Sequence, residues 1–552
     1  MRCIALLGAL ACTVNEGGPS ATPASPPAAA TLELRISYGS EKKAWLEEQI
    51  TAFEAGSPTT ASGRPIDVVA TGKGSGEAMT DILTGKASPH VYSPASSAYL
   101  TLLNDAWLKQ PGHTAPLTSS AELLVLSPVV IGLWKPMAEA LGWPGKALGW
   151  ADLLNVSRGG KGWAAFGHPE WGAFKLAHTH PGLSNSGLLA VLAEVYAGAG
   201  KTRGLDAADL SSAGVADFLT EVETSLVHYG KSTTFLADKM RERGPSYVSA
   251  AVLYESQIVE AAANPGDLPL VAIYPVEGTF WSDHPYAVLD APQVGPDERD
   301  AAAQLLAFLK SRPAQERAIQ AGFRPADPSV PLAPPLTTTP GVDMAQPQTL
   351  LDVPGGDVLS GVLALWEQHK KPSEVTLIFD KSGSMRGNPL LKAKEGAGAF
   401  LDSLGDRDEV ALLFFDDAVA PPPEPVLLGG GGRERLKGSV DGAIASGGTA
   451  LYDAVIAAYD AAASRAAAEP ATIHAVVVMT DGRDENSRQN LEAVKARLSS
   501  SSEGAVKVFT IAYGDGADPA VLGAIAESGR GGTARGGQGD ITGVFRDMAA
   551  FF

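Results

Sequence analysis

A short apolar run that ends in clustered oxygen side chains constrains this chain more than any other stretch. Residues 376–385 read Thr-Leu-Ile-Phe-Asp-Lys-Ser-Gly-Ser-Met. An apolar run bounded by a turn signal predicts a buried strand, and Asp380, Ser382 and Ser384 follow at its carboxyl end. Alternate residues of one tight loop can direct three oxygen atoms at a single point, and hard cations such as Mg²⁺ prefer oxygen ligands. The stretch therefore indicates a buried strand that ends in a candidate cation site.

The region around this stretch alternates strands and helices. The expected strands are 375–379, 409–415, 474–479 and 506–513, and the expected helices are 390–404, 433–445, 451–468, 490–498, 519–527 and 541–552. Continuous apolar strands separated by helices indicate a parallel sheet covered on both faces. Ligands of such sheets lie outside the carboxyl ends of the strands. At that edge we expect two more polar loops, 446–450 (Ser-Gly-Gly-Thr-Ala) and 479–482 (Met-Thr-Asp-Gly).

Residues from all three loops match a known metal site in order and kind. They are Asp380, Ser382, Ser384, Thr449 and Asp481. The match resembles the metal-ion-dependent adhesion site of von Willebrand factor A domains, and it covers residues 373–552. The alternative is that these residues cap and turn a parallel α/β domain that holds no metal.

This resemblance implies a doubly wound, mostly parallel sheet and a bound Mg²⁺ or Mn²⁺. It implies that Ser382 and Ser384 bind the ion directly, and that Thr449 binds it directly or through water. Asp380 and Asp481 would bind the ion or orient the groups that do. Hydroxyl ligands leave the ion electron-poor, so the implied partner is a protein that offers a carboxylate to its open position.

Residues 31–330 form another α/β region. An alternating strand (32–38), a helical pattern (41–55) and a second strand (66–70) open it. A glycine- and serine-rich turn, 71–79, then leads into a helix, and residues 184–186 precede a second apolar helix. Backbone N–H groups at such helix starts form natural anion sites, although each stretch alone also fits a simply capped helix.

This region resembles the extracellular solute-binding proteins, the two-lobed receptors of ABC transporters. The features that carry the resemblance are the strand–helix opening, the turn at 74–76, the stretch 93–97, the helix start at 184–187 and the closing stretch 303–325. The resemblance implies two α/β lobes with a small solute held in the cleft between them, and an oxyanion is one candidate class of solute. It suggests as cleft residues Gly74, Ser75, Gly76, Ser97, Ser184, Ser186, Gly187, Tyr254 and Glu255. The alternative is a cleft that has lost its ligand, and Glu77 and Glu255 would repel an anion if they faced it.

The amino terminus resembles a bacterial lipoprotein signal peptide, residues 1–12, with lipidation expected at Cys12. Residues 13–30 are rich in Pro, Ser, Thr, Ala and Gly, which predicts a disordered tether. No later run reaches the roughly 18 to 20 apolar residues that a spanning helix needs. We therefore expect a location in the cell envelope, outside the cytoplasm, with the lipid as the membrane contact. An ordinary cytosolic start, or a start codon placed too late, is the alternative.

Composition excludes other classes of function. The net charge of −19 and the isoelectric point near 5.0 argue against a nucleic-acid partner. We find no Walker-type phosphate loop and no set of nucleophile, base and orienting group, so we do not expect an enzyme. His178 and His180 form a His-x-His pair, which we interpret as surface or structural.

The two regions are separated by a proline-rich joint with a short helix, residues 331–372. Our leading hypothesis is a surface-anchored protein that binds a protein partner through a divalent metal, as an adhesion protein or a scaffold, with a solute-binding-like receptor region. The alternative is an ABC-transporter receptor for a small ligand, in which the A domain is a docking module.

Overall fold

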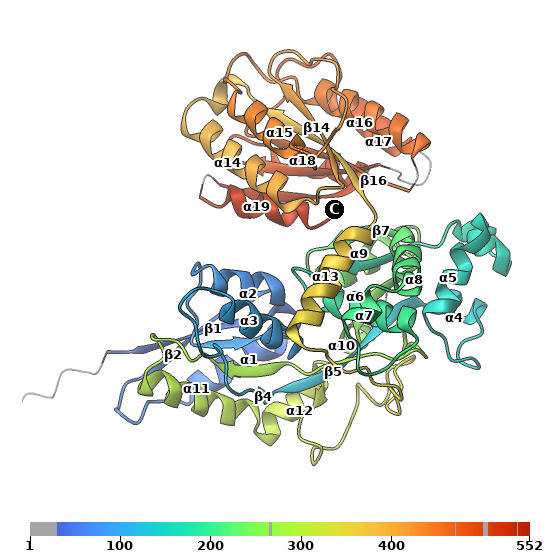
Figure 1. The fold of residues 1–552 in the computed structure, drawn as a ribbon. Coiled ribbons are helices and arrows are strands. Elements are labelled where there is room, and N and C mark those ends of the chain that lie inside the picture. The colour runs from blue at the N-terminus through green and yellow to red at the C-terminus, as the bar shows by residue number, and fades with distance from the viewer. Residues whose placement is uncertain (1–29, 264–265, 267, 470, 501–505, 538) are drawn as a thin grey trace, which may run out of the picture.

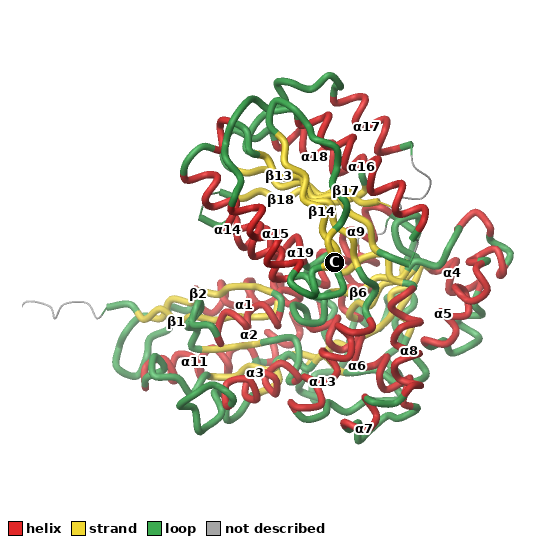
Figure 2. Tube along the Cα trace, turned by 45° about the horizontal axis from the view of Figure 1, so that its top comes forward, coloured by secondary structure: helices red, strands yellow, loops and turns green. Residues whose placement is uncertain are grey.

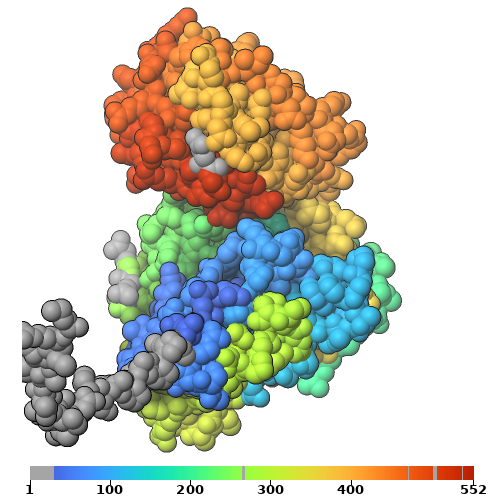
Figure 3. Space-filling model, turned by 90° about the vertical axis from the view of Figure 1, so that its left-hand side faces the viewer, coloured from blue at the N-terminus to red at the C-terminus, as the bar shows by residue number. Residues whose placement is uncertain are grey.

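The computed structural model describes residues 30–263, 266, 268–469, 471–500, 506–537 and 539–552 (Figure 1). The predicted signal peptide, Cys12 and the tether as far as residue 29 lie outside the described residues. The chain forms an N-terminal body of two lobes and a C-terminal body seated on it (Figure 3). The predicted fold class, a two-lobed region followed by a mostly parallel α/β domain, is confirmed.

Lobe 1 is built on a five-stranded sheet with the order β2-β1-β3-β11-β4. Its central strand, β1, is parallel to β2 and β3, and β11 returns antiparallel to β3 and β4 from much later in the chain. The strands are β1 (Leu32–Gly39), β2 (Ile66–Lys73), β3 (Val91–Ser93), β4 (Glu122–Leu123) and β11 (Pro285–Val288). The helices are α1 (Lys43–Ala55), α2 (Ser75–Leu83), α3 (Ala98–Leu108), α11 (Pro296–Leu309) and α12 (Arg312–Gln320).

Lobe 2 is built on a seven-stranded sheet with the path β10-β5-β8-β6-β7, to which β9 and β12 add by pairing with β5. Its strands are β5 (Val125–Trp134), β6 (Leu176–Thr179), β7 (Leu226–Gly230), β8 (Ala250–Tyr254), β9 (Leu270–Ile273), β10 (Trp281–Ser282) and β12 (Arg324–Pro325). Its helices are α4 (Lys135–Ala140), α5 (Trp150–Ser157), α6 (Asn185–Ala199), α7 (Ala207–Leu210), α8 (Ala213–Thr224), α9 (Thr233–Arg243) and α10 (Glu255–Ala263). Helix α6 is the core helix of this lobe, because residues 185–196 are all buried.

The proline-rich joint packs back over the N-terminal body. Val330 and Leu336 lie in a small apolar cluster with Val259 and Ile319, and Leu351 N–H donates to the Thr279 carbonyl at 2.9 Å. Helix α13 (Gly356–His369) follows and contacts α3 of lobe 1 and α6, α7 and α8 of lobe 2 (Figure 1). The helix before the C-terminal body is therefore a brace between the two lobes.

The C-terminal body has a six-stranded sheet with the order β15-β14-β13-β16-β17-β18. Its core strands are parallel: β13 (Ser373–Asp380), β14 (Glu409–Phe415), β16 (Ile473–Thr480) and β17 (Val506–Tyr513). Helices cover both faces of the sheet (Figure 2). On one face lie α14 (Asn388–Ser403), α15 (Gly432–Asp441) and α19 (Ile541–Ala549), and on the other α16 (Leu451–Ala468), α17 (Leu491–Ser499) and α18 (Pro519–Ser528).

Details of the C-terminal body differ from the sequence-based expectation; the expected helix 433–445, for example, ends at Asp441. The edge strands β15 (Val426–Leu427) and β18 (Arg530–Gly536) were not predicted, because neither segment has an apolar run long enough to indicate a strand. The last helix ends at Ala549 instead of residue 552. Phe551 and Phe552 leave the helix and become buried, with 6% and 1% of their surface exposed.

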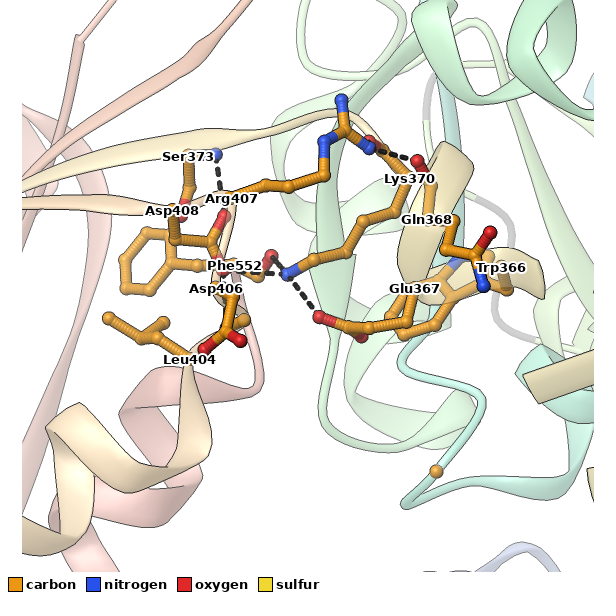
Figure 4. A network of polar contacts seen from close by, with 12 residues as sticks. Trp366, Glu367, Gln368, Lys370, Ser373, Leu404, Asp406, Arg407, Asp408 and Phe552 are labelled. Atoms are coloured by element: carbon orange, nitrogen blue, oxygen red, sulfur yellow. Dashed lines mark hydrogen bonds and ion pairs between the residues drawn. The ribbon is translucent and has the colours of Figure 1, made fainter. Parts of the chain in front are cut away.

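The contact between the two bodies involves the amino ends of the C-terminal strands. Phe551 packs against His228 and Phe235 of lobe 2, and its carbonyl accepts from Tyr229 N–H at 3.3 Å. Lys370, at the end of α13, donates to Asp408 and to the Phe552 carbonyl (Figure 4). The contact is a packed interface with buried polar groups. Among the described residues, no helix has the length and apolar character to cross a membrane.

Candidate functional site

The five predicted metal-site residues lie at the carboxyl edge of the C-terminal sheet. Asp380 is the last residue of β13, Ser382 and Ser384 lie in the turn after it, and Asp481 directly follows β16. Strands β13 and β16 are parallel neighbours, with Phe379 opposite Met479, so their loops emerge side by side. Thr449 lies in the loop that leads into α16.

Hydrogen bonds join these side chains. The Ser382 and Ser384 hydroxyls are 2.9 Å apart, and Ser384 Oγ donates to Asp481 Oδ1 at 2.6 Å. Asp380 Oδ1 accepts from Ser382 N–H at 2.8 Å, and its Oδ2 accepts from Thr480 Oγ1 at 2.5 Å. Asp380 is fully buried and held at both oxygens, whereas Ser384 is exposed. Asp380 thus orients the loop, with Ser382 buried beside it, Asp481 partly exposed and Ser384 exposed.

Backbone contacts hold the Thr449 loop against the β13 turn. Gly383 N–H donates to the Gly447 carbonyl at 3.0 Å, and Ser446 N–H donates to the Lys381 carbonyl at 2.8 Å. Gly447 has a φ of 71°, a conformation that L side chains rarely adopt, and a Cβ there would lie 2.9 Å from Asp417 Oδ1. The glycine turn is therefore needed to bring Thr449 to the site.

The donor set fits a divalent cation. A Cβ on Gly482 would lie 3.3 Å from Thr449 Oγ1 and 3.8 Å from Ser384 Oγ, so this glycine leaves open space between two of the hydroxyls. Burial raises the pKa of Asp380, although its hydrogen bonds from Thr480 and Ser382 oppose the rise. Burial also raises the pKa of Asp481. The hydrogen bond from Ser384 lowers that pKa, and the negative charge of Asp380 raises it further. Two crowded carboxylates with neutral hydroxyls around them suit a hard cation that takes oxygen ligands.

Lys381, next to Asp380 in the chain, pairs with a different carboxylate. Lys381 occupies the variable position of the motif, and its Nζ pairs with Asp416. Burial raises the pKa of Asp416, but the hydrogen bond from Lys381 and other contacts keep it below its usual value. Asp416 also accepts from Ser446 Oγ at 3.2 Å. Lys381 therefore stabilises the rim of the site.

In the N-terminal body, the two helix starts predicted to bind a solute face each other. Gly76 N–H and Glu77 N–H, at the start of α2 in lobe 1, donate to the Leu183 carbonyl of lobe 2 at 3.0 and 3.3 Å. Tyr99 Oη donates to the Pro181 carbonyl at 2.8 Å and adds a second bond between the lobes. A Cβ on Gly74 or Gly76 would overlap the carbonyls of Leu183 or Gly182. The lobes are closed on each other at the position expected for an anion.

The other predicted cleft residues also bond to protein groups. Ser75 Oγ accepts from Ala95 N–H, Ser97 Oγ donates to Asp283, and Tyr254 Oη accepts from Asn185. The remaining contacts of this set are Ser184 with Thr233, Ser186 with Thr179 and Thr233, Gly187 against the Thr179 carbonyl, and Glu255 with Arg324 and Tyr274. Solute binding by these residues stays a prediction.

Comparison with known families now identifies both bodies. The family described as bacterial extracellular solute-binding protein matches residues 34–324, more than half of the 552-residue chain. The chain belongs to this family. The von Willebrand factor type A domain family matches residues 374–535, so a solute-binding protein here carries an A domain. No curated protein matches the sequence.

Solved structures of both kinds are similar to this solute-binding protein. The sulfate-binding protein SubI from Mycobacterium tuberculosis is 19% identical, with 55% of this chain and 88% of that one covered and a TM-score of 0.37. The periplasmic binding protein AfuA from Actinobacillus pleuropneumoniae is 14% identical, with 61% and 98% covered and a TM-score of 0.43. A von Willebrand factor type A protein from Catenulispora acidiphila is 23% identical, with 33% and 42% covered and a TM-score of 0.29.

Some residues that shape the A-domain site were not expected from the sequence. Thr480 holds Asp380, and it is the last residue of β16, within the polar stretch 479–482. Asn486 Oδ1 accepts from Thr449 N–H at 3.0 Å, and a Cβ on Gly448 would overlap the Asn486 side chain. Nothing in the sequence around Asn486 indicates this contact, because it depends on how two loops pack.

Proposed function

We propose that this solute-binding protein acts outside the cytoplasm as a metal-dependent protein-binding module, an adhesion protein or scaffold without catalytic activity. The observation that carries the proposal is the arrangement of Ser382, Ser384 and Asp481 at the carboxyl edge of the sheet, where Ser384 is exposed, with Thr449 close by and Asp380 buried. Mg²⁺ or Mn²⁺ would be held by these residues, and it would supply a Lewis-acidic position for a partner's carboxylate. The lipid anchor at Cys12 is part of the same proposal.

The orientation of the A domain supports this function. Strand β13 starts at Ser373, next to the interface with lobe 2, and ends at Asp380. An eight-residue strand spans roughly 23 Å, so the metal edge faces away from the N-terminal body and is open to a second protein. Ile444, 77% exposed, and the exposed Arg386 and Arg483 lie on loops at this edge and would contact that protein.

Metal titration of the full chain tests the metal half of the proposal. We expect Mg²⁺ or Mn²⁺ to raise the unfolding temperature, since a ligand at 100 times its Kd stabilises by about 2.7 kcal/mol. Ser382→Ala/Ser384→Ala should abolish this gain, whereas Ser403→Ala, on the exposed side of α14, should keep it. An unchanged gain in the double variant would refute the metal assignment.

Binding to immobilised aspartate-containing peptides, with Mg²⁺ or with a chelator, tests the adhesion half. We expect binding in Mg²⁺ that the chelator and the double variant both remove. Metal binding without any peptide binding would support the metal site but refute the proposal that a partner's carboxylate binds to it.

Transport reception is the second candidate, and membership in the solute-binding family favours it. In this case a small solute would bind between the lobes, and an oxyanion is the first class to test. The A domain would then serve as the module through which the receptor docks to another protein. Calorimetry of the full chain against sulfate, phosphate, sugars and amino acids tests it. Saturable heat with any of them would support transport, and no heat with all of them would reject it for those classes.

A further inference from the structure

Lobe 2 contains a buried cluster of one histidine and two glutamates. His178 lies on β6, Glu194 on α6 and Glu223 on α8, and all three are 0% exposed. One potential ligand atom from each lies within 4.8 Å of the others. The cluster is in the N-terminal body and shares no residue with the A-domain site or with the predicted solute cleft.

Glu194 is the unusual member of the cluster. Both of its carboxylate oxygens are buried, and neither has a hydrogen-bond partner among the described residues. A buried carboxylate that lacks a partner is strongly unfavourable, so such a group holds a proton or a cation. Burial, and then the neighbouring Glu223 carboxylate, raise the pKa of Glu194 to about 8.

His178 is oriented as a metal-binding histidine is. Its Nδ1 lies 2.8 Å from the Thr179 carbonyl, and this contact places a proton on Nδ1 in the neutral ring. Its Nε2 then offers a lone pair toward Glu223 Oε1, which is 3.2 Å away. Two lone pairs that face each other inside a protein need a positive charge between them. Burial lowers the pKa of His178, but the Glu223 charge and hydrogen bond raise it to about 9, so a proton on Nε2 supplies this charge when no metal is bound. A bound cation would take the place of that proton.

Glu223 accepts a hydrogen bond at each of its two carboxylate oxygens. Tyr229 Oη donates to Glu223 Oε2 at 2.6 Å, and Trp366 Nε1 donates to Oε1 at 2.9 Å. Such hydrogen bonds fix a carboxylate in place for a metal ion. Because Trp366 lies on α13, the cluster is linked to the helix that braces the lobes and leads to the A domain.

We infer that His178, Glu194 and Glu223 form a second metal site, for a divalent transition cation of the Zn²⁺ class. One imidazole nitrogen with two carboxylates is a donor set that Zn²⁺ and similar ions accept, whereas Mg²⁺ prefers oxygen ligands alone. Two carboxylates and a neutral imidazole balance a 2+ ion, so the filled site carries no net charge in the core. The bound cation would link β6, α6 and α8 beneath α13, and it would make the part of lobe 2 that contacts the A domain more rigid.

Zinc binding by the full chain tests this site apart from the A-domain site. The background is Ser382→Ala/Ser384→Ala, which lacks the hydroxyl ligands of the adhesion site. After incubation with Zn²⁺ and exhaustive dialysis, we expect about one equivalent of zinc by mass spectrometry. In this background Glu194→Gln should weaken zinc binding by at least tenfold, as should His178→Gln, whereas Glu221→Gln, which changes a solvent-facing carboxylate on the same helix as Glu223, should not.

Glu194→Gln keeps the shape of the side chain and removes its charge, so we expect it to fold, with circular dichroism as the check. If His178→Gln fails to fold, anomalous scattering from zinc-soaked crystals provides an independent measurement, with a peak expected between His178 Nε2 and the two carboxylates. Zinc that is absent from the background protein, or equally retained by Glu194→Gln, would overturn the inference. The cluster would then hold a proton and no metal.

Discussion

Lys370 Nζ lies 2.9 Å from Asp408 Oδ2, and this ion pair ties the helix that braces the two lobes to the A domain (Figure 4). The Lys370 side chain is 3% exposed and that of Asp408 is 0% exposed. Asp408 also accepts from Ser373 N–H at 2.8 Å and from Gly405 N–H at 2.7 Å. One carboxylate thus fixes the start of β13, a neighbouring loop and the end of α13.

Lys370→Met should destabilise the protein by about 3–5 kcal/mol, because it leaves the Asp408 charge buried without its cation. Urea unfolding of the full chain measures this. The control is Lys231→Met, which breaks the Lys231–Asp547 pair at the same interface; its side chains are 45% and 49% exposed, so the loss should stay below about 1 kcal/mol. Equal losses in the two variants would contradict the role of the buried pair.

Gly76→Ala should separate the lobes. The added methyl group would overlap the Gly182 carbonyl and lie 2.9 Å from Tyr99 Oη, so we expect a loss of about 1–3 kcal/mol and a larger radius of gyration in small-angle scattering. Gly214→Ala is the control, since the nearest atom to its Cβ is 3.6 Å away. An unchanged scattering curve for Gly76→Ala would mean that the lobes do not rely on this contact.

Lys507→Met should stabilise the protein by about 1 kcal/mol or more, since a buried polar group without a hydrogen bond is unfavourable. Lys507 lies on β17 at the interface, and its buried Nζ has no hydrogen-bond partner among the described residues. Burial, with Arg243 and other nearby cations, holds the pKa of Lys507 well below its usual value. The Tyr247 ring, 5.0 Å from Nζ, offsets part of the penalty. Thermal unfolding measures the gain, and a loss of stability would show that this contact dominates.

His228 should make the protein less stable in mild acid. Burial, and then the Lys507 charge from β17 and the Arg243 charge from α9, hold the pKa of His228 well below its usual value of about 6.5. Below pH 6.5 the unfolded chain binds a proton at this histidine and the folded protein does not, so the free energy of unfolding falls as the pH decreases.

Comparison with His228→Asn isolates this histidine from the other titrating groups. Wild type should lose about 2 kcal/mol more than the variant between pH 7.5 and pH 5. Urea unfolding at a series of pH values gives the difference. Parallel stability curves for the two proteins would show that His228 is protonated equally in the folded and unfolded states.

The parallel core of the A domain could be predicted from the sequence, because each buried strand is a continuous apolar run between helices. The edge strand β18 could not be, since Arg-Gly-Gly-Thr-Ala-Arg-Gly has no such run and pairs with β17 through its backbone. The same reasoning brought Asp380, Ser382 and Asp481 to one edge, because parallel strands end on the same side. It could not identify Asn486, whose position depends on the packing of two loops.

In the N-terminal body, the pattern of helix starts at Gly76 and Ser184 was visible in the sequence, and the sequence by itself determined that each start has free backbone donors. Only the tertiary structure decided that Gly76 N–H meets the Leu183 carbonyl, because residues far apart in the chain meet there. The His178–Glu194–Glu223 cluster has the same origin, since β6, α6 and α8 contribute one residue each. The local sequence pattern determines which helices and strands form and at which edge of the sheet each parallel strand ends. The packing of distant elements decides which acceptor each backbone donor meets and which buried charges come together.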